Sequence, residues 1–248
     1  MTSVLRLNQL LPGPANEVDA VSAYAHPAPR EGHLRANFVA SVDGAAALGG
    51  RVGALTGPAD QRLLVLLRSL CDVLLVGAGT VRAEGYGPVR ALPALADVRR
   101  AAGQAPAPRL AVLTRHIELD LASSAFMDAA ERPIVVTTEA ADPGRVREAQ
   151  QVADVLVAGE ETVDLRLVRT LLVESGLPRI LSEGGPKVLA ELYAADLVDE
   201  LDLAISPVIT AGDEPRITDG PALLRPQALH LEAGFESEGF LFLRYVRG

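Results

Sequence analysis

Two hydrophobic patterns alternate along most of the chain. Short runs that are nearly continuous in Val, Leu and Ile predict strands covered on both faces. These runs are Leu34–Ser41, Asp72–Val76, Arg109–Thr114, Pro133–Thr138, Asp154–Val157, Arg179–Ser182 and Leu201–Ile209. Stretches with apolar residues at helical spacing predict amphipathic helices at Asp60–Leu70, Asp164–Glu174 and Lys187–Ala195. The alternation predicts an α/β fold with a mostly parallel central sheet flanked by helices.

The two ends of the chain and one internal segment depart from this alternation. Residues 1–32 form a proline-punctuated arm with room for only one short helix, so we assign residues 33–248 to a single domain. Near the C-terminus, His230–Ala233 and Phe240–Tyr245 alternate around glycines and predict an antiparallel hairpin that closes one sheet edge. The weakly patterned segment Gly85–Pro108 is expected to cover a cleft.

Composition and charge argue against several classes of binding partner, among them nucleic acids, membranes and metal ions. A net charge of −9 argues against general nucleic-acid binding, although local backbone N–H groups and arginines can still hold an anionic cofactor. The chain shows no apolar run near the ~18 residues of a membrane helix and no signal peptide, so we expect a cytoplasmic protein without a membrane partner. Cys71 closes an apolar helical face and is expected in the core. The four histidines are scattered, so no metal site is expected.

Two predicted strands run into glycine turns that lead into helical stretches. The first turn is Gly77-Ala-Gly79-Thr80 and the second is Glu183-Gly-Gly-Pro186. Free N–H groups at such helix starts can hold a phosphate. Each turn alone is also an ordinary strand-to-helix connection, and Arg82 replaces the third glycine of a dinucleotide fingerprint. Together the two turns indicate a pyrophosphate site.

A third strand ends in the polar tip Ser41-Val-Asp43-Gly44, although Asp-Gly is also a common turn dipeptide. Other motifs are missing from the sequence. It contains no phosphate-binding G-x-x-x-x-G-K-[ST] segment, no H-E-x-x-H and no G-x-S-x-G. P-loop nucleotidases, zinc peptidases and α/β hydrolases are therefore disfavoured.

Taken in order, these segments resemble the reductase domain of riboflavin biosynthesis, a pyrimidine reductase branch of the dihydrofolate reductase-like superfamily. The resemblance extends from about Leu34 to the C-terminus, and the arm resembles that of stand-alone actinobacterial-type members without a fused deaminase. It implies a dihydrofolate reductase-like fold, NADPH as cofactor and a homodimer. It also implies a reaction like that of 5-amino-6-(5-phosphoribosylamino)uracil reductase, in which the ribose of a ribosylaminopyrimidine phosphate opens and hydride reaches C1′.

The resemblance also implies roles for individual residues. Residues expected at the cofactor are Val39, Thr80, Glu84, Thr114, Arg115, Gly184, Gly185, Pro186, Lys187 and Val188. Those expected at the substrate are Asn37, Arg68 and Glu183, and the candidate catalytic residues are Glu84 and Asp43. The run Thr114-Arg115-His116 independently offers a hydroxyl, a guanidinium and an imidazole suited to a phosphomonoester.

The sequence departs from the family pattern at two positions. Asn37 stands where riboflavin reductases often have lysine, and Ala54 stands where some members have tryptophan. These changes leave the substrate open. A related alternative is reduction of a dihydrofolate-like pteridine, and an alternative of another class is a non-catalytic nucleotide-binding protein. Retention of both Arg68 and Glu183 favours an enzyme.

Overall fold

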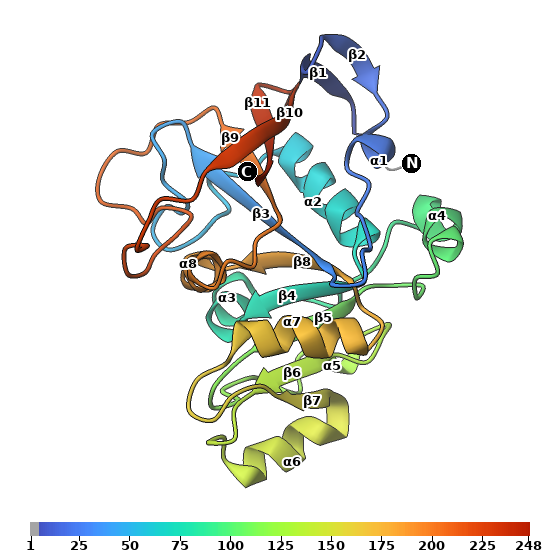
Figure 1. Ribbon diagram of the computed structural model, residues 1–248, viewed down its shortest axis with the longest axis vertical. Helices are drawn as coiled ribbons and strands as arrows, with labels where there is room; N and C mark the ends of the chain where they lie inside the picture. The colour runs from blue at the N-terminus through green and yellow to red at the C-terminus, as the bar shows by residue number, and fades with distance from the viewer. Residues whose placement is uncertain (1–4) are drawn as a thin grey trace.

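An eleven-stranded sheet runs through the computed structural model, which describes residues 5–248 (Figure 1). Its strand order is β2-β1-β10-β11-β9-β3-β8-β4-β5-β6-β7. The strands are β1 Leu7–Leu11, β2 Ala15–Val18, β3 His33–Ser41, β4 Val73–Gly77, β5 Arg109–Leu113, β6 Ile134–Thr137, β7 Asp154–Val157, β8 Arg179–Gly184, β9 Glu200–Ser206, β10 Leu229–Ser237 and β11 Phe240–Arg247. The helices are α1 Ala20–Ala23, α2 Pro58–Leu70, α3 Ala78–Glu84, α4 Ala96–Ala101, α5 Ser124–Met127, α6 Pro143–Val152, α7 Leu165–Glu174 and α8 Pro186–Ala194, with a 3₁₀ turn at Pro93–Leu95.

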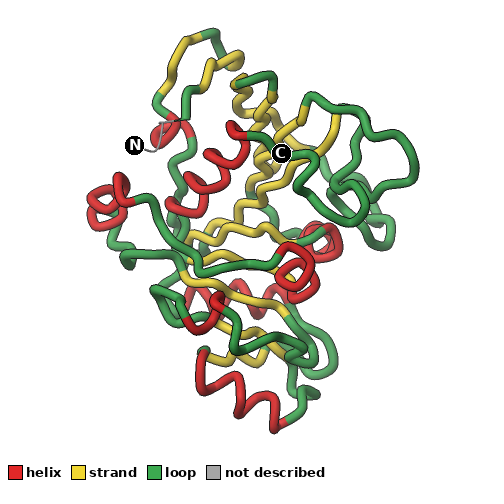
Figure 2. The backbone as a smooth tube through the Cα atoms, turned by 180° about the vertical axis from the view of Figure 1, so that it is seen from behind, coloured by secondary structure: helices red, strands yellow, loops and turns green. Residues whose placement is uncertain are grey.

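The strands from β9 to β7 are all parallel and are covered by helices on both faces. Successive residues of β4 show why, because Leu74 and Val76 join one core cluster while Val73 and Leu75 join the other. Helices α2, α3 and α6 pack on the first cluster, and α7 and α8 pack on the second. Figure 2 shows from behind how helices surround the strands. The predicted α/β class with a mostly parallel sheet is confirmed.

Local sequence explains where the helices begin. Helix α2 starts with Pro58 in its first turn, and α7 starts after Asp164, whose carboxylate accepts hydrogen bonds from two backbone N–H groups. Helix α6 was not predicted. It has the same kind of start, Asp142-Pro143, but it buries only Ala149 fully, so its apolar pattern is weak. Cys71 is fully buried, as expected.

The C-terminal hairpin is confirmed, but its predicted place at the sheet edge is wrong. Strand β11 pairs with β9, and β10 continues past Gly234 to pair with β1 of the arm. The arm contains one short helix, α1, as expected, but it also forms a hairpin of β1 and β2 that was not predicted. Hence β2 and β7 are the edge strands.

A buried ion cluster lies where the arm crosses the sheet. The side chain of Arg35 on β3 is fully buried and lies 2.9 Å from Glu200 and 3.2 Å from Asp202 on β9. It also donates to the backbone oxygens of Tyr24 and Ala25. Burial raises the pKa of Asp202 to about 8. The cluster therefore ties the arm to the sheet by charge-assisted hydrogen bonds.

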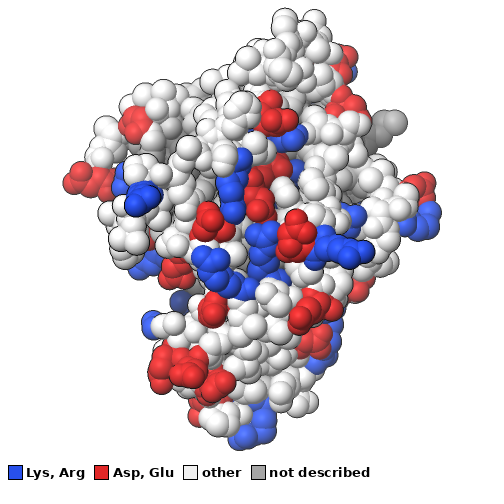
Figure 3. Space-filling model, viewed as in Figure 1, with Lys and Arg blue, Asp and Glu red and all other residues white. Residues whose placement is uncertain are grey.

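The surface carries interspersed charges. Figure 3 shows Lys and Arg side chains beside Asp and Glu side chains across one face, with no single-sign field. Within residues 5–248, no helix combines the length and the apolar character needed to cross a lipid bilayer.

Candidate active site

Two cavities lie at the carboxyl ends of the parallel strands, where open α/β sheets bind ligands. The large cavity, of about 1150 Å³, lies between the turns that follow β4 and β8. The small cavity, of about 580 Å³, lies between α2, β3 and the end of α3. Gly79, Thr80, Gly185 and Pro186 line both of them. The cavities therefore meet at the two glycine turns.

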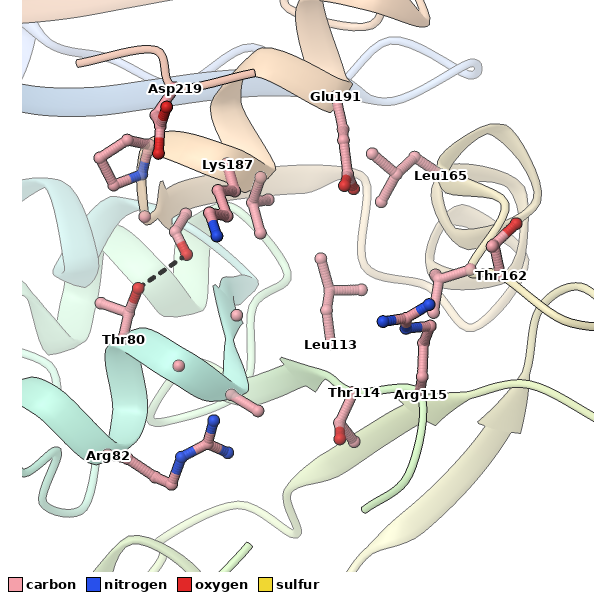
Figure 4. A pocket seen from close by; sticks show the side chains of 18 of the residues that line it. Thr80, Arg82, Leu113, Thr114, Arg115, Thr162, Leu165, Lys187, Glu191 and Asp219 are labelled. Atoms are coloured by element: carbon pink, nitrogen blue, oxygen red, sulfur yellow. Dashed lines mark hydrogen bonds between the residues drawn. The ribbon is translucent and has the colours of Figure 1, made fainter. Parts of the chain in front are cut away.

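The two glycine turns are packed against each other. Gly185 has φ +85°, and a Cβ added there would lie 2.4 Å from the Thr80 hydroxyl oxygen. Thr80 Oγ1 in turn donates to the Gly184 carbonyl oxygen at 3.2 Å (Figure 4). Both the left-handed conformation and the close approach require glycine at position 185. Lys187 and Val188 in the first turn of α8 line the large cavity, which therefore faces the positive end of the helix dipole.

Cationic side chains from three elements surround the large cavity. Arg82 lies on α3, Arg115 follows β5 and Lys187 lies on α8, and Figure 4 shows them around one space. Thr114 lies in the same wall, where its Oγ1 accepts from the Ile117 N–H at 3.0 Å and shapes the turn that carries Arg115. Acidic residues, including Glu191, also line the cavity. This wall can hold phosphate groups at several points.

An ion pair stands in the wall of the small cavity. Arg68 on α2 donates to Glu183 at the end of β8 through Nε to Oε1 at 2.7 Å and Nη2 to Oε2 at 2.5 Å. The Tyr86 hydroxyl also donates to Glu183 Oε2 at 2.6 Å, and the Arg68 guanidinium lies 5.3 Å from the Tyr86 ring centre. The two residues expected at the substrate thus lie in one cavity, where they bind each other.

Burial, and after it the Glu183 carboxylate, raises the pKa of the Tyr86 hydroxyl well above its usual value. Tyr86 therefore remains a donor to Glu183. The sequence analysis did not identify Tyr86. The only available signal was an aromatic residue between Gly85 and Gly87, directly after Glu84.

Helix α2 presents a second acid to the small cavity. Asp60, Leu64 and Arg68 line the cavity at spacings of four residues, which places them on one helical face. Only 6% of Asp60 is exposed. Burial, and after it the charge of Glu183, raises the pKa of Asp60 to about 6. Asp60 was also missed, although its spacing from Arg68 was readable.

Several other residues predicted at the cofactor or the substrate line one of the two cavities. Asn37 and Val39 on β3 line it, so Val39 lies beside the smaller space and not the larger one. Glu84 lines the same wall, and its carboxylate accepts from the Val52 N–H at 3.3 Å. Pro186 lines both cavities, and Val188 lines the large one.

Asp43 does not join the other predicted residues. It lines neither cavity, because its carboxylate accepts from the Ser41 hydroxyl at 2.5 Å and from the Ala211 N–H at 2.7 Å. The Ser41 hydroxyl, and then the Ala211 N–H, lowers the pKa of Asp43 to about 2. The residue fastens the end of β3 to the segment after β9, so we leave it out of the proposed catalytic set.

The segment Gly85–Pro108 covers the cleft only at its start. Gly85, Tyr86 and Gly87 line the small cavity, while the remainder folds away through the 3₁₀ turn and α4. There the buried Arg99 donates to the backbone oxygens of Ser69 and Cys71 at the end of α2. Through Arg99, this part of the segment therefore caps the C-terminal end of α2.

The site as a whole is a cleft with two chemically different halves. One half offers a helix N-terminus and cations, and the other offers Arg68, Glu183, Tyr86 and Asp60. This arrangement suits an extended anionic ligand whose end meets a polar heterocycle at Thr80. Within residues 5–248 no three His, Cys, Asp or Glu side chains are placed to hold a metal ion.

Comparisons with known proteins point to one group. The family model described as the RibD C-terminal domain matches residues 32–235. The chain is 32% identical to the 2,5-diamino-6-ribosylamino-4(3H)-pyrimidinone 5′-phosphate reductase of Archaeoglobus fulgidus, over 67% of this chain and 76% of that one. It is 31% identical to the enzyme of the same name from Methanothermobacter thermautotrophicus, over 75% and 83% of the two chains.

Solved structures show the same likeness. A pyrimidine reductase-like protein from Corynebacterium diphtheriae is similar with a TM-score of 0.79 at 29% identity, over 88% of this chain and 93% of that one. A riboflavin biosynthesis reductase from Saccharomyces cerevisiae shares the fold, with a TM-score of 0.65 at 19% identity, over 92% and 97% of the two chains.

Proposed function

The chain belongs to the family of the RibD C-terminal domain, and from that premise we propose that it is an NADPH-dependent reductase of a ribosylaminopyrimidine phosphate. The observation that carries the proposal is the meeting of the two cavities at Thr80 and Gly185. A cofactor in the large cavity and a substrate in the small cavity would come into contact there. Proximity of this kind converts a bimolecular hydride transfer into a step within one complex.

The residues of the large cavity fit a phosphorylated dinucleotide. The first turn of α8 can supply backbone N–H groups to a phosphate. It follows Gly185, where an added Cβ would clash with Thr80. Arg115 and Lys187 supply charge, and Thr114 fixes the turn that carries Arg115. We assign Thr114 and Arg115 to the 2′-phosphate of NADPH and the α8 turn to its pyrophosphate. The cofactor supplies the hydride; the chain supplies binding, orientation and exclusion of water.

The residues of the small cavity suit a pyrimidine that carries a phosphorylated sugar. A carboxylate offers about four acceptor sites, and Arg68 and Tyr86 fill three of those of Glu183, so about one further hydrogen bond from a ring N–H or amino group can be accepted. Arg68 supplies a guanidinium for a carbonyl or phosphate oxygen, and Asn37 supplies an amide. The relatives are named for a 2,5-diaminopyrimidinone substrate, so we rank this compound before the corresponding uracil.

We also propose a homodimer. Large apolar side chains are exposed along one region of the sheet, among them Leu241 on β11, Ile209 after β9 and Leu11 on β1. The inward residues Phe240 and Phe242, in contrast, are part of the core. A second copy of the chain would cover the exposed side chains. Light scattering should give a mass above the 26.0 kDa of one chain, and a monomer mass at micromolar concentration would contradict the dimer.

The function is tested with purified protein, NADPH and three substrates: the diaminopyrimidinone ribosyl phosphate, the corresponding uracil and dihydrofolate. We expect NADPH oxidation with a ribosylaminopyrimidine phosphate and a ribitylamine product that carries deuterium at C1′ when deuterated NADPH is used. Turnover of dihydrofolate alone would favour a pteridine reductase. Binding of NADPH without turnover of any substrate would reject the reductase proposal.

A further inference from the structure

We infer that Asp60 is the proton donor for opening of the ribose ring in the small cavity. This inference rests on the proposed function. In the reaction, the lone pair of the exocyclic nitrogen forms a C=N bond to C1′ and the C1′–O4′ bond breaks. A proton from the Asp60 carboxyl passes to O4′, which becomes a hydroxyl. NADPH held in the large cavity would supply the hydride that C1′ receives and would become NADP⁺, and Asp60 regains a proton from solvent. One hydride and one proton are consumed for each product.

Other side chains that line the small cavity are poor proton donors. Glu183 accepts two hydrogen bonds from Arg68 and one from Tyr86, so both of its oxygens already act as acceptors. Tyr86 already donates its proton to Glu183, and the guanidinium of Arg68 does not deprotonate. Glu84 is exposed to solvent. Among these acidic and cationic side chains of the small cavity, Asp60 is therefore the remaining candidate proton donor.

Asp60 has the environment that a general acid requires. Only 6% of Asp60 is exposed, and among residues 5–248 its carboxyl has no hydrogen-bond or ion-pair partner. Burial, and then Glu183, raises the pKa of Asp60 to about 6. A carboxyl is an efficient acid when its pKa approaches the working pH. Its cavity neighbours are Glu183 from β8, Arg68 from its own helix, and Glu84 and Tyr86 from the end of α3.

Binding of the substrate and the cofactor should raise the pKa of Asp60 further. A substrate phosphate and the phosphates of the cofactor bring negative charge to the cleft and displace water from it. Both changes disfavour the ionised form of Asp60 and raise its pKa further toward neutrality. Because the protonated form is the active one, kcat should be highest at low pH and fall as pH rises through the pKa of Asp60 in the complex.

The test compares Asp60→Asn with Asp60→Glu and with the control Asp97→Asn, an exposed site on α4 outside both cavities. Asparagine has the shape of the protonated acid, so the variant should fold and bind both ligands. We expect kcat of Asp60→Asn to fall roughly 10²–10⁴-fold with KM little changed. The decline of kcat at high pH should disappear in Asp60→Asn and return, displaced, in Asp60→Glu.

A second readout does not depend on turnover. Infrared difference spectra of the ligand-free native protein minus Asp60→Asn should show a protonated carboxyl band that titrates near pH 6. Unchanged kcat and pH profile in Asp60→Asn, or a carboxyl ionised already at about pH 4, would overturn the inference while the reductase function stands. A lower kcat with an unchanged pH profile would also overturn it. Absence of turnover in the native protein would overturn the proposed function and this inference together.

Discussion

Arg68 and Glu183 form a two-bond ion pair, Nε to Oε1 at 2.7 Å and Nη2 to Oε2 at 2.5 Å, that joins helix α2 to the end of β8 across the small cavity. We propose both residues as contacts of the substrate. In the ligand-free protein they orient each other, with Tyr86 as a third member. A substrate that binds there meets side chains already fixed in position, which lowers the entropic cost of binding.

Removing one member of this pair should cost more than removing both. In Arg68→Ala the Glu183 carboxylate, whose side chain is 6% exposed, loses its cation. We expect a stability loss toward the lower end of ~3–5 kcal/mol, because Arg68 is itself 25% exposed. Substrate KM should rise as well. Urea unfolding of Arg68→Ala, Glu183→Gln and the double variant measures the coupling, with Tyr86→Phe as the control that keeps the pair. Additive losses in the double variant would show that the two side chains act independently.

Cofactor selectivity should depend on Arg115. This exposed side chain lines the large cavity after β5 and is assigned to the 2′-phosphate that distinguishes NADPH from NADH. A charge-assisted hydrogen bond contributes about 1.5–3 kcal/mol. Arg115→Ala should therefore weaken NADPH binding by roughly tenfold or more and leave NADH unchanged. Fluorescence titration with both cofactors checks this, and Arg90→Ala, outside both cavities, is the matched control. Equal affinity of the native protein for NADPH and NADH would reject the assignment.

Much of the central fold was readable from local sequence. Continuous apolar runs marked every parallel strand within a few residues, and β7 was predicted with its observed bounds. Strand β9 ends at Ser206 instead of Ile209, because Pro207 has no N–H to continue the ladder. The carboxyl ends of parallel strands meet at one edge, which is why Thr80 and Gly185 could be placed together.

The errors have a common physical cause, since each depends on contacts between distant segments. The arm forms strands because β10 offers an open edge, and nothing within the arm itself encodes that partner. Asp43 was expected to be a catalytic residue because it follows the end of a strand, but its carboxylate accepts hydrogen bonds from the backbone N–H groups at positions 210 and 211. Asp60 and Tyr86 gain their roles only when α2 packs beside the end of α3.

The contact between the two glycine turns predicts a strong effect of one methyl group. In Gly185→Ala the new Cβ meets Thr80 Oγ1 at 2.4 Å and must adopt φ +85°. We expect a stability loss of ~1–3 kcal/mol from the backbone strain alone, together with weaker NADPH binding. Thermal unfolding measures the loss. Gly79→Ala is the control, because a Cβ there meets no atom within 4 Å and alanine favours the helix. The double variant with Thr80→Ala should recover only the part due to the clash, and full recovery would show that the backbone is unstrained.

The buried cluster around Arg35 predicts a pH dependence with a definite sign. Burial raises the pKa of Asp202 from 3.8 to about 8, so the folded state binds this proton more tightly than the unfolded state does. The stabilising contribution of Asp202 to the free energy of unfolding is therefore complete below about pH 4 and is lost as pH rises through about 8. Asp202→Asn should reduce the fall in Tm between pH 5 and pH 8 relative to the native protein, because asparagine cannot ionise.

The same cluster provides the contrasting variant. Arg35→Met removes the cation that Glu200 faces at 2.9 Å and leaves a buried carboxylate with the weaker contacts to Arg244 at 3.3 Å and to the His33 imidazole at 3.6 Å. We expect a loss of about 3–5 kcal/mol around neutral pH, far larger than that of Asp202→Asn. Denaturant unfolding at pH 7 compares the two. Equal losses would mean that Asp202 is ionised and paired in the folded protein, and its proposed neutral state would have to be abandoned.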